Sequence, residues 1–209
     1  MMNSLTELIL VRHGETEWNL SGFIQGCTDI PLSSNGRLQA VEVSESLTNS
    51  FDVIYTSPLQ RALDTAKAIS NGKFPIIIDD KFREVPFGNW EGKRFEDLTD
   101  ENYKKFCRGE DGLPIGDTGK SIRYWEEKNA EVLLNICHEN EGKRIVVVSH
   151  GAWIKCAILG LLKLEPKAYH NIKLGNTGVS RVKFPYGYPI LENFNITSHT
   201  SLGDRSKTG

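Results

Sequence analysis

Residues 8–14 read LILVRHG, and residues 145–151 read IVVVSHG. In each stretch, four consecutive apolar residues lead directly into a polar residue, a histidine and a glycine. Apolar runs of this kind are typical of strands buried on both faces of a sheet. Because the carboxyl ends of parallel strands meet at one edge, where ligands bind in open α/β sheets, we expect His13 and His150 to lie together.

Short apolar runs alternate with helical patterns along the rest of the chain. Residues 51–55 and 74–78 are rich in aromatic and β-branched side chains and form two further candidate strands, again expected to be buried. Alternation of strands with helices is the pattern of a parallel sheet covered on both sides. The sequence therefore predicts a three-layer α/β/α sandwich with a mostly parallel central sheet.

Four helices are predicted between and after these strands. Ser33, Ser57 and Ser121 are suitable capping residues, and Pro58 is favoured at a helix start because its missing N–H is not needed there. The fourth helix, residues 152–162, is apolar nearly all round and is expected to be central. The residues expected to face the core are Leu38, Val41 and Leu47 in the first helix, Leu59, Ala62, Leu63, Ala66 and Ile69 in the second, and Ile122, Trp125, Asn129, Val132, Leu133 and Ile136 in the third.

The length of 209 residues suits one domain over residues 1–209. Residues 87–119 are irregular and contain six glycines, which suggests a lid or an insertion over one edge of the sheet. Residues 198–209 are polar and small, as expected of a tail. A net charge of −2, from 25 Lys+Arg and 27 Asp+Glu, argues against a nucleic-acid partner.

Membrane and export signals are not evident in the sequence. No run reaches the roughly 18 apolar residues that span a bilayer, and the N-terminus lacks a basic and apolar leader. Cys27, Cys107, Cys137 and Cys156 are far apart, so we expect reduced thiols and a cytoplasmic protein, monomeric or homodimeric. The chain has no HxH or HExxH motif and no clustered cysteines, so no metal site is expected.

Two arginines and a glutamate accompany the paired histidines. Arg12 adjoins His13, and Arg61 falls in the first turn of the helix predicted after Ser57. Helix N-termini favour anions, and guanidinium groups bind phosphate oxygens in a bidentate manner. Taken singly, Arg61 would be read as a surface residue and Glu84 as a solvated carboxylate. Together the set predicts an anion cage, in which Glu84 beside a phosphate would hold a proton and serve as a general acid.

These motifs together resemble the histidine phosphatase superfamily, in its phosphoglycerate mutase-like branch. An RHGE element alone is moderately specific, whereas several elements in register from Leu8 to about Phe184 are strongly so. The matching elements are Val11-Arg12-His13-Gly14-Glu15-Thr16 with Asn19, Gln25-Gly26 with Asp29 and Pro31-Leu32, Thr56-Ser57-Pro58-Leu59 with Arg61-Ala62 and Thr65-Ala66, Arg83-Glu84 with Gly88 and Trp90-Glu91-Gly92, and Val148-Ser149-His150-Gly151.

The resemblance implies a role for each matching residue. His13 would be the nucleophile that becomes phosphohistidine, and Glu84 the proton donor and later the base for water. Arg12, Arg61 and His150 would hold the phosphoryl oxygens, with Asn19, Gln25 and Gly26 lining the same substrate pocket. The implied enzyme is a cofactor-independent phosphomonoesterase acting on a small phosphorylated metabolite, with neither metal nor organic cofactor.

The choice among branches of the family is less direct. The resemblance favours hydrolysis because the chain is short and residues 23–26, FIQG, are similar to the phosphatase branch. A 2,3-bisphosphoglycerate-dependent phosphoglycerate mutase and a ribazole-phosphate phosphatase remain alternatives. Many relatives carry Gly-Glu-Ser where this chain has Gly119-Lys120-Ser121, so Lys120 would favour a more anionic substrate if that loop edges the pocket.

Residues 87–119 are expected to decide the substrate. Their aromatic side chains could either pack or touch the ligand, and their basic side chains could form a solvated helix face. The aromatic residues are Phe87, Trp90, Tyr103 and Phe106, and the basic residues are Lys93, Arg94, Lys104, Lys105 and Arg108.

Overall fold

The computed structural model describes residues 5–47, 51–201 and 203. Within them, six strands form one sheet in the order β3-β2-β4-β1-β5-β6. β1 through β4 run parallel to their neighbours among themselves, whereas β5 and β6 are antiparallel additions at one side. The strands are β1 (Thr6–Arg12), β2 (Val53–Thr56), β3 (Ile76–Ile78), β4 (Arg144–Ser149), β5 (Val179–Phe184) and β6 (Ile190–Ile196).

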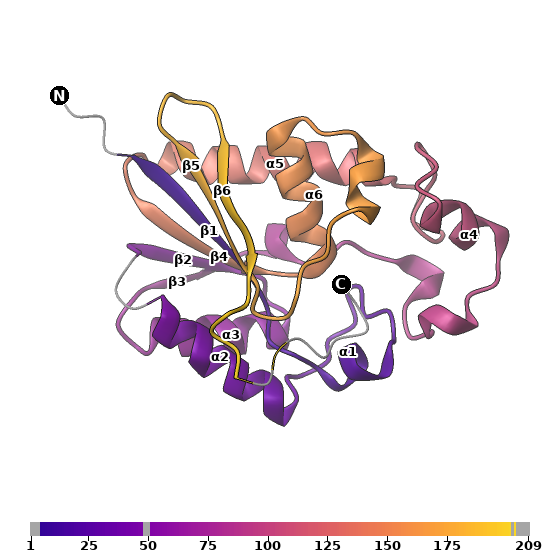
Figure 1. The fold of residues 1–209 in the computed structure, drawn as a ribbon, viewed down its shortest axis with the longest axis horizontal. Helices are drawn as coiled ribbons and strands as arrows, with labels where there is room; N and C mark the ends of the chain where they lie inside the picture. The colour runs from indigo at the N-terminus through magenta and orange to yellow at the C-terminus, as the bar shows by residue number, and fades with distance from the viewer. Residues whose placement is uncertain (1–4, 48–50, 202, 204–209) are drawn as a thin grey trace.

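Two pairs of helices cover the two faces of the sheet (Figure 1). α2 (Ser34–Ser46) and α3 (Gln60–Ser70) pack on one face, and α5 (Ile122–Glu139) and α6 (Gly151–Leu162) on the other. Alternate residues of β1 enter opposite cores: Leu8 and Leu10 pack with α5 and α6, and Ile9 and Val11 with α2 and α3. The predicted three-layer sandwich with a mostly parallel sheet is confirmed.

The central strands are buried on both sides, but β3 is not. β1 is fully buried along its length, and β4 is buried from Ile145 onward. β3 is a short edge strand on which Ile77 and Ile78 are exposed, so the expectation of a buried strand over residues 74–78 is wrong. Exposure follows from its position, because an edge strand has a neighbour on one side alone.

The predicted inward face of α2 is also wrong in two places. Leu38 and Val41 are 46% and 50% exposed, whereas Ala40 and Val43 are buried. Gly36 explains the orientation, because a Cβ there would lie 2.0 Å from the Glu15 carbonyl oxygen. The helix therefore approaches the loop after β1 through its small residues and turns Leu38 and Val41 toward solvent.

Three short elements complete the sandwich. α1 (Glu17–Ser21) begins with a capping box between Thr16 and Asn19, η1 (Asp80–Phe82) follows β3, and η4 (Pro166–His170) follows α6. No helix in the described ranges is both long and apolar enough to cross a bilayer.

Residues 87–119 lie beside α6, away from the main sheet (Figure 1). They contain η2 (Gly88–Trp90), η3 (Phe95–Asp97) and α4 (Glu101–Cys107). Trp90 and Ile115 from this segment pack in a third core with Ala152 and Cys156 of α6. α6 is thus sandwiched between the sheet and this segment, which explains why it is apolar nearly all round.

Part of the expected C-terminal tail, residues 202 and 204–209, lies outside the described residues. The part before it contacts the body of the protein. His199 Nε2 lies 3.2 Å from Thr177 Oγ1, and the Ser201 N–H donates to Glu42.

Candidate active site

The carboxyl ends of β1 and β4 bring the two histidines together. The strands pair in register up to Arg12 and Ser149, and the His13 N–H donates to the Ser149 carbonyl at 2.9 Å. The rings of His13 and His150 are buried, with centroids 5.2 Å apart. The convergence expected from the two strand ends is confirmed.

The backbone fixes the tautomer of His13. Its Nδ1 lies 2.7 Å from the Gly14 carbonyl oxygen, which can only accept a hydrogen bond. Nδ1 therefore carries the proton, and Nε2 keeps its lone pair. Burial, reinforced by the nearby charges of Arg61 and Arg12, holds the pKa of His13 well below its ordinary value. His13 is thus a neutral imidazole near pH 7, the form that can act as a nucleophile.

Arg61, at the start of α3, lies between the two histidines. Its Nε is 3.3 Å from His13 Nε2 and 3.2 Å from His150 Nδ1, so one N–H is shared by two rings. Nη1 and Nη2 donate to the carbonyls of Thr28 and Gly26 at 2.7 and 2.8 Å. Burial lowers the pKa of Arg61 to about 10, which leaves it cationic near neutrality.

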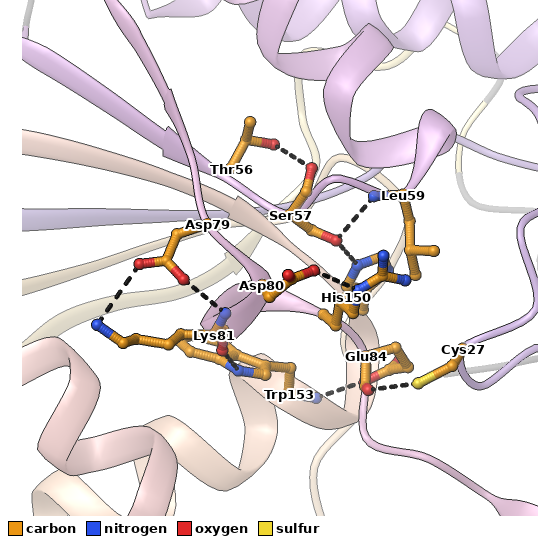
Figure 2. Close-up of polar contacts among 11 residues, drawn as sticks. Cys27, Thr56, Ser57, Leu59, Asp79, Asp80, Lys81, Glu84, His150 and Trp153 are labelled. Atoms are coloured by element: carbon orange, nitrogen blue, oxygen red, sulfur yellow. Dashed lines mark hydrogen bonds and ion pairs between the residues drawn. The ribbon is translucent and has the colours of Figure 1, made fainter.

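His150 has its other ring nitrogen against Ser57 (Figure 2). Nε2 lies 2.8 Å from Ser57 Oγ, and because Nδ1 faces the Arg61 donor, Nε2 carries the proton and donates. Ser57 Oγ also accepts from the Leu59 N–H at 3.2 Å. α3 begins at Gln60 and its N-cap position is Leu59, so the expectation that Ser57 caps this helix directly is wrong. Ser57 instead joins the helix start to His150.

Glu84 accepts hydrogen bonds from the N-terminus of α6. Its carboxylate receives the N–H groups of Ala152 at 3.1 Å and Trp153 at 2.8 Å, and that of Val85 at 2.8 Å. Figure 2 shows Glu84 with Trp153, and with Cys27 Sγ donating to the Glu84 backbone carbonyl. Burial raises the pKa of Glu84 above its ordinary value, although these hydrogen bonds and Arg61 oppose the shift. Burial thus shifts Glu84 toward its protonated form in the free protein, before any like-charge effect of a phosphate.

The neighbouring loop presents the remaining expected residues. Thr16 Oγ1 lies 3.0 Å from both Asn19 Oδ1 and Gln25 Oε1, so its single O–H is shared between the two amide groups. Gly26 has φ of +49°, and a Cβ there would lie 2.0 Å from Glu91 Oε1. Only glycine fits this turn, which places the Gly26 carbonyl against Arg61.

These residues meet at a cavity of about 380 Å³. Seven of the eight expected site residues line it, and His150 lies behind them against Arg61 and His13. The lining residues are Arg12, His13, Asn19, Phe23, Ile24, Gln25, Gly26, Arg61, Glu84, Phe87, Phe95, Tyr103, Phe106, Cys107, Gly151, Ala152, Lys155, Tyr169, His170, Asn171, Ile172 and Lys173.

Several lining residues were not expected from the sequence. His170, which in isolation suggests a structural residue, lines the cavity, as do Lys155 and Tyr169. Lys155 had a visible signal, because it is the one charge in the otherwise apolar helix 152–162. Asn176 also contributes, donating through Nδ2 to the His13 carbonyl at 3.0 Å and to Asn19 at 3.2 Å. It comes from a loop that no sequence motif marked.

Residues 87–119 contribute aromatic side chains to the cavity, and none of their basic side chains line it. Phe87, Tyr103 and Phe106 line it, whereas Trp90 is buried in the third core. Lys120 is exposed and does not line the cavity; its Nζ lies 4.2 Å above the Tyr124 ring. The loop that carries Lys120 therefore does not edge the pocket, and the condition under which Lys120 would favour a more anionic substrate is not met.

No group of three or more histidine, cysteine or acidic side chains in the described part of the chain could hold a metal ion.

Comparison with known proteins agrees with this geometry. The sequence profile of the histidine phosphatase superfamily (branch 1) matches residues 8–197. Uncharacterized phosphatase PhoE of Bacillus subtilis is 32% identical, over 94% of this chain and 98% of the relative. A metal-independent phosphoserine phosphatase of Arabidopsis thaliana is 31% identical, over 95% of this chain and 85% of the relative.

Solved structures show the same fold. Phosphoserine phosphatase of Entamoeba histolytica in complex with 3-phosphoglyceric acid is 56% identical, with a TM-score of 0.90 over 93% of this chain and 99% of that one. A mutant of that enzyme, in complex with phosphoserine, is 55% identical and also has a TM-score of 0.90, over 93% of this chain and 98% of that one. This chain therefore belongs to branch 1 of the histidine phosphatase superfamily and is a phosphatase.

Proposed function

We propose that this enzyme hydrolyses phosphoserine through a phosphohistidine formed on His13, with no metal or organic cofactor. The observation that carries the proposal is the neutral His13, whose Nε2 lone pair lies 3.3 Å from the Arg61 Nε donor. The identity of 56% to a phosphoserine phosphatase supports this choice of substrate.

The first step transfers the phosphoryl group to the protein. His13 Nε2 attacks phosphorus, and the bond from phosphorus to the serine oxygen breaks. Glu84 gives its proton to the leaving oxygen, so serine departs as a neutral alcohol. Arg12 and Arg61 stabilise the charge on the transferring group, while the Nδ1–H bond to the Gly14 carbonyl stabilises the positive charge on the ring.

The second step returns the enzyme to its starting state. Glu84, now a carboxylate, takes a proton from water as the water oxygen attacks phosphorus. The bond between phosphorus and His13 Nε2 breaks, the ring becomes neutral again, and inorganic phosphate leaves. Glu84 ends this step protonated, so one group serves as acid and then as base.

The remaining residues fit the binding of a small substrate. Asn19, Gln25 and Gly26 line the cavity, His150 supports Arg61 from behind it, and the cavity has the size usual for small-molecule sites. We assign residues 87–119 the role of a lid, because Phe87 and Phe106 border the cavity on the side away from the sheet. As none of the four cysteines forms a disulfide, we place the enzyme in the cytoplasm. We expect it to be a monomer or a homodimer.

Steady-state kinetics on purified protein tests the substrate. We expect the highest kcat/KM for phosphoserine in a panel that includes 3-phosphoglycerate, ribazole phosphate and an aryl phosphate, with activity retained in a chelator. A preference for ribazole phosphate, or isomerisation of 3-phosphoglycerate stimulated by 2,3-bisphosphoglycerate, would instead establish one of the two alternatives.

A further inference from the structure

Lys155 is a buried cation at the active-site cavity that the phosphoryl-transfer steps do not use. It lies on α6, five residues after His150, and is 4% exposed. Its Nζ lies 3.9 Å from the centroid of the Tyr169 ring. Among the residues that the structure describes, no carboxylate lies within ion-pair distance of this ammonium group.

The helix directs Lys155 into the same cavity as the reaction centre. Gly151 and Ala152 line the cavity, and Lys155 follows them by four and three residues, respectively, on the same face of α6. The Ala152 N–H donates to Glu84, so the Lys155 side chain leaves α6 one helical turn after the residue that binds the proposed general acid. A group bound to Lys155 would therefore belong to a molecule that also reaches the phosphoryl site.

Other basic groups of the cavity are placed differently. Arg12 and Arg61 lie beside His13, where the phosphoryl group would bind. Lys173 is exposed. Burial and the charge of Lys155 lower the pKa of His170, which favours its neutral form. In the described part of the cavity, Lys155 is therefore the buried lysine suited to a second anionic group.

A packing role alone does not account for this lysine. Burial lowers the pKa of Lys155 to about 8, because an ammonium group removed from water is disfavoured without a counter-charge. The Tyr169 ring supplies a cation–π contact but no negative charge. An apolar side chain of similar length would pack here without that cost, whereas a substrate carboxylate would supply the missing charge.

We propose that Lys155 binds the carboxylate of the substrate and selects phosphomonoesters that carry a carboxylate a few bonds from phosphorus. This inference rests on the proposed function and adds the residue that binds the substrate's carboxylate. Phosphoserine and 3-phosphoglycerate both carry a carboxylate at this separation, whereas phosphoethanolamine and glycerol 3-phosphate carry none.

Matched substrates and matched lysines test the assignment. Lys155→Met should lower kcat/KM for phosphoserine about 10- to 100-fold, as expected for the loss of one charge-assisted contact. Phosphoethanolamine lacks only the carboxylate. Its kcat/KM should change less than about threefold in the same variant, because its phosphoryl contacts remain. Lys120→Met is the control, because Lys120 also lies over a tyrosine ring but outside the cavity, and it should leave both substrates unchanged.

A second pair separates this proposal from the choice of phosphoserine. If the wild type does not hydrolyse phosphoserine, the ratio of kcat/KM for 3-phosphoglycerate to that for glycerol 3-phosphate should still fall about 10- to 100-fold in Lys155→Met. That outcome would reject phosphoserine and keep the role of Lys155.

A third variant guards against a folding defect. Lys155→Arg keeps the positive charge, and it should retain most of the wild-type preference for the carboxylate-bearing member of each pair. Equal losses for both members of a pair in Lys155→Met would overturn the assignment, as would a wild type with no preference for the carboxylate.

Discussion

Arg61 Nε points at His13 Nε2 from 3.3 Å, and the backbone of the neighbouring loop holds the rest of its guanidinium group. The same N–H also reaches His150 at 3.2 Å. The cation is thus fixed at the atom that would bond to phosphorus before any substrate arrives. Donors positioned in advance stabilise a transferring group without reorganising during the reaction.

The fixed fork of Arg61 makes a lysine a poor replacement. Lys has a single ammonium group and cannot contact the Gly26 and Thr28 carbonyls while also reaching the phosphoryl oxygens. We expect Arg61→Lys to lower kcat/KM for p-nitrophenyl phosphate by about 100- to 1,000-fold. Arg37→Lys is the control, because Arg37 does not line the cavity. A change of less than threefold in Arg61→Lys would contradict a direct role in transition-state binding.

The pKa shifts of His13 and Glu84 predict a bell-shaped pH dependence of kcat/KM. Activity needs a neutral His13, whose lowered pKa places the acid limb below pH 6.5. Activity also needs a protonated Glu84, and its raised pKa means that this proton is lost at a higher pH than from an ordinary glutamate. We therefore expect an acid limb that follows deprotonation of His13 and an alkaline limb that follows loss of the Glu84 proton. The alkaline limb should disappear in Glu84→Gln, and its persistence there would assign that limb to another group.

Leaving-group chemistry isolates the proton donor. In Glu84→Gln, kcat/KM for phosphoserine should fall about 100- to 10,000-fold, because the serine alkoxide leaves without a proton. For p-nitrophenyl phosphate, kcat/KM reports only the steps up to departure of nitrophenolate and should fall less than about tenfold, because this stable anion needs no general acid. Equal losses on both substrates would show that Glu84 acts on the phosphoryl group or on the fold instead.

Titration of Lys155 offers a test on the unmodified enzyme. With a pKa of about 8, mainly because of burial, its positive charge is present below that pH and lost above it. The ratio of kcat/KM for 3-phosphoglycerate to that for glycerol 3-phosphate should therefore fall as pH rises through about 8. Losses common to both substrates cancel in the ratio, and a ratio constant from pH 6 to 10 would contradict a charged contact. The ionisable groups that border Lys155 or act on its charge are Arg12, Glu84, Cys156, Tyr169, His170 and Lys173.

The sequence predicted those parts of the fold that depend on local patterns. Four buried apolar residues before each histidine are enough to identify two central parallel strands, and their ends define the site. β5 and β6, which read VSRVKF and ILENFNI, were not predicted, because polar residues interrupt both. Antiparallel strands at the side of a sheet tolerate such mixtures, so the continuous apolar signal is absent.

Other features depend on contacts between distant residues. The orientation of α2 follows from the approach of Gly36 to Glu15, and an apolar stripe contains no information about that contact. His150 Nε2 contacts Ser57, whose position before Pro58 had predicted a helix-capping role instead. The sequence shows Lys155 as the one charge in an apolar helix, but it does not show that this residue lines the cavity.

The proposed reaction depends on a phosphohistidine that forms at His13 during turnover. Phosphoserine labelled in its phosphate should be mixed with excess enzyme, quenched in alkali within milliseconds, and the protein digested for mass spectrometry. We expect an alkali-stable, acid-labile phosphate on the peptide that contains His13, with neither label nor turnover in His13→Ala. Label on another residue, or steady hydrolysis by His13→Ala, would contradict the account.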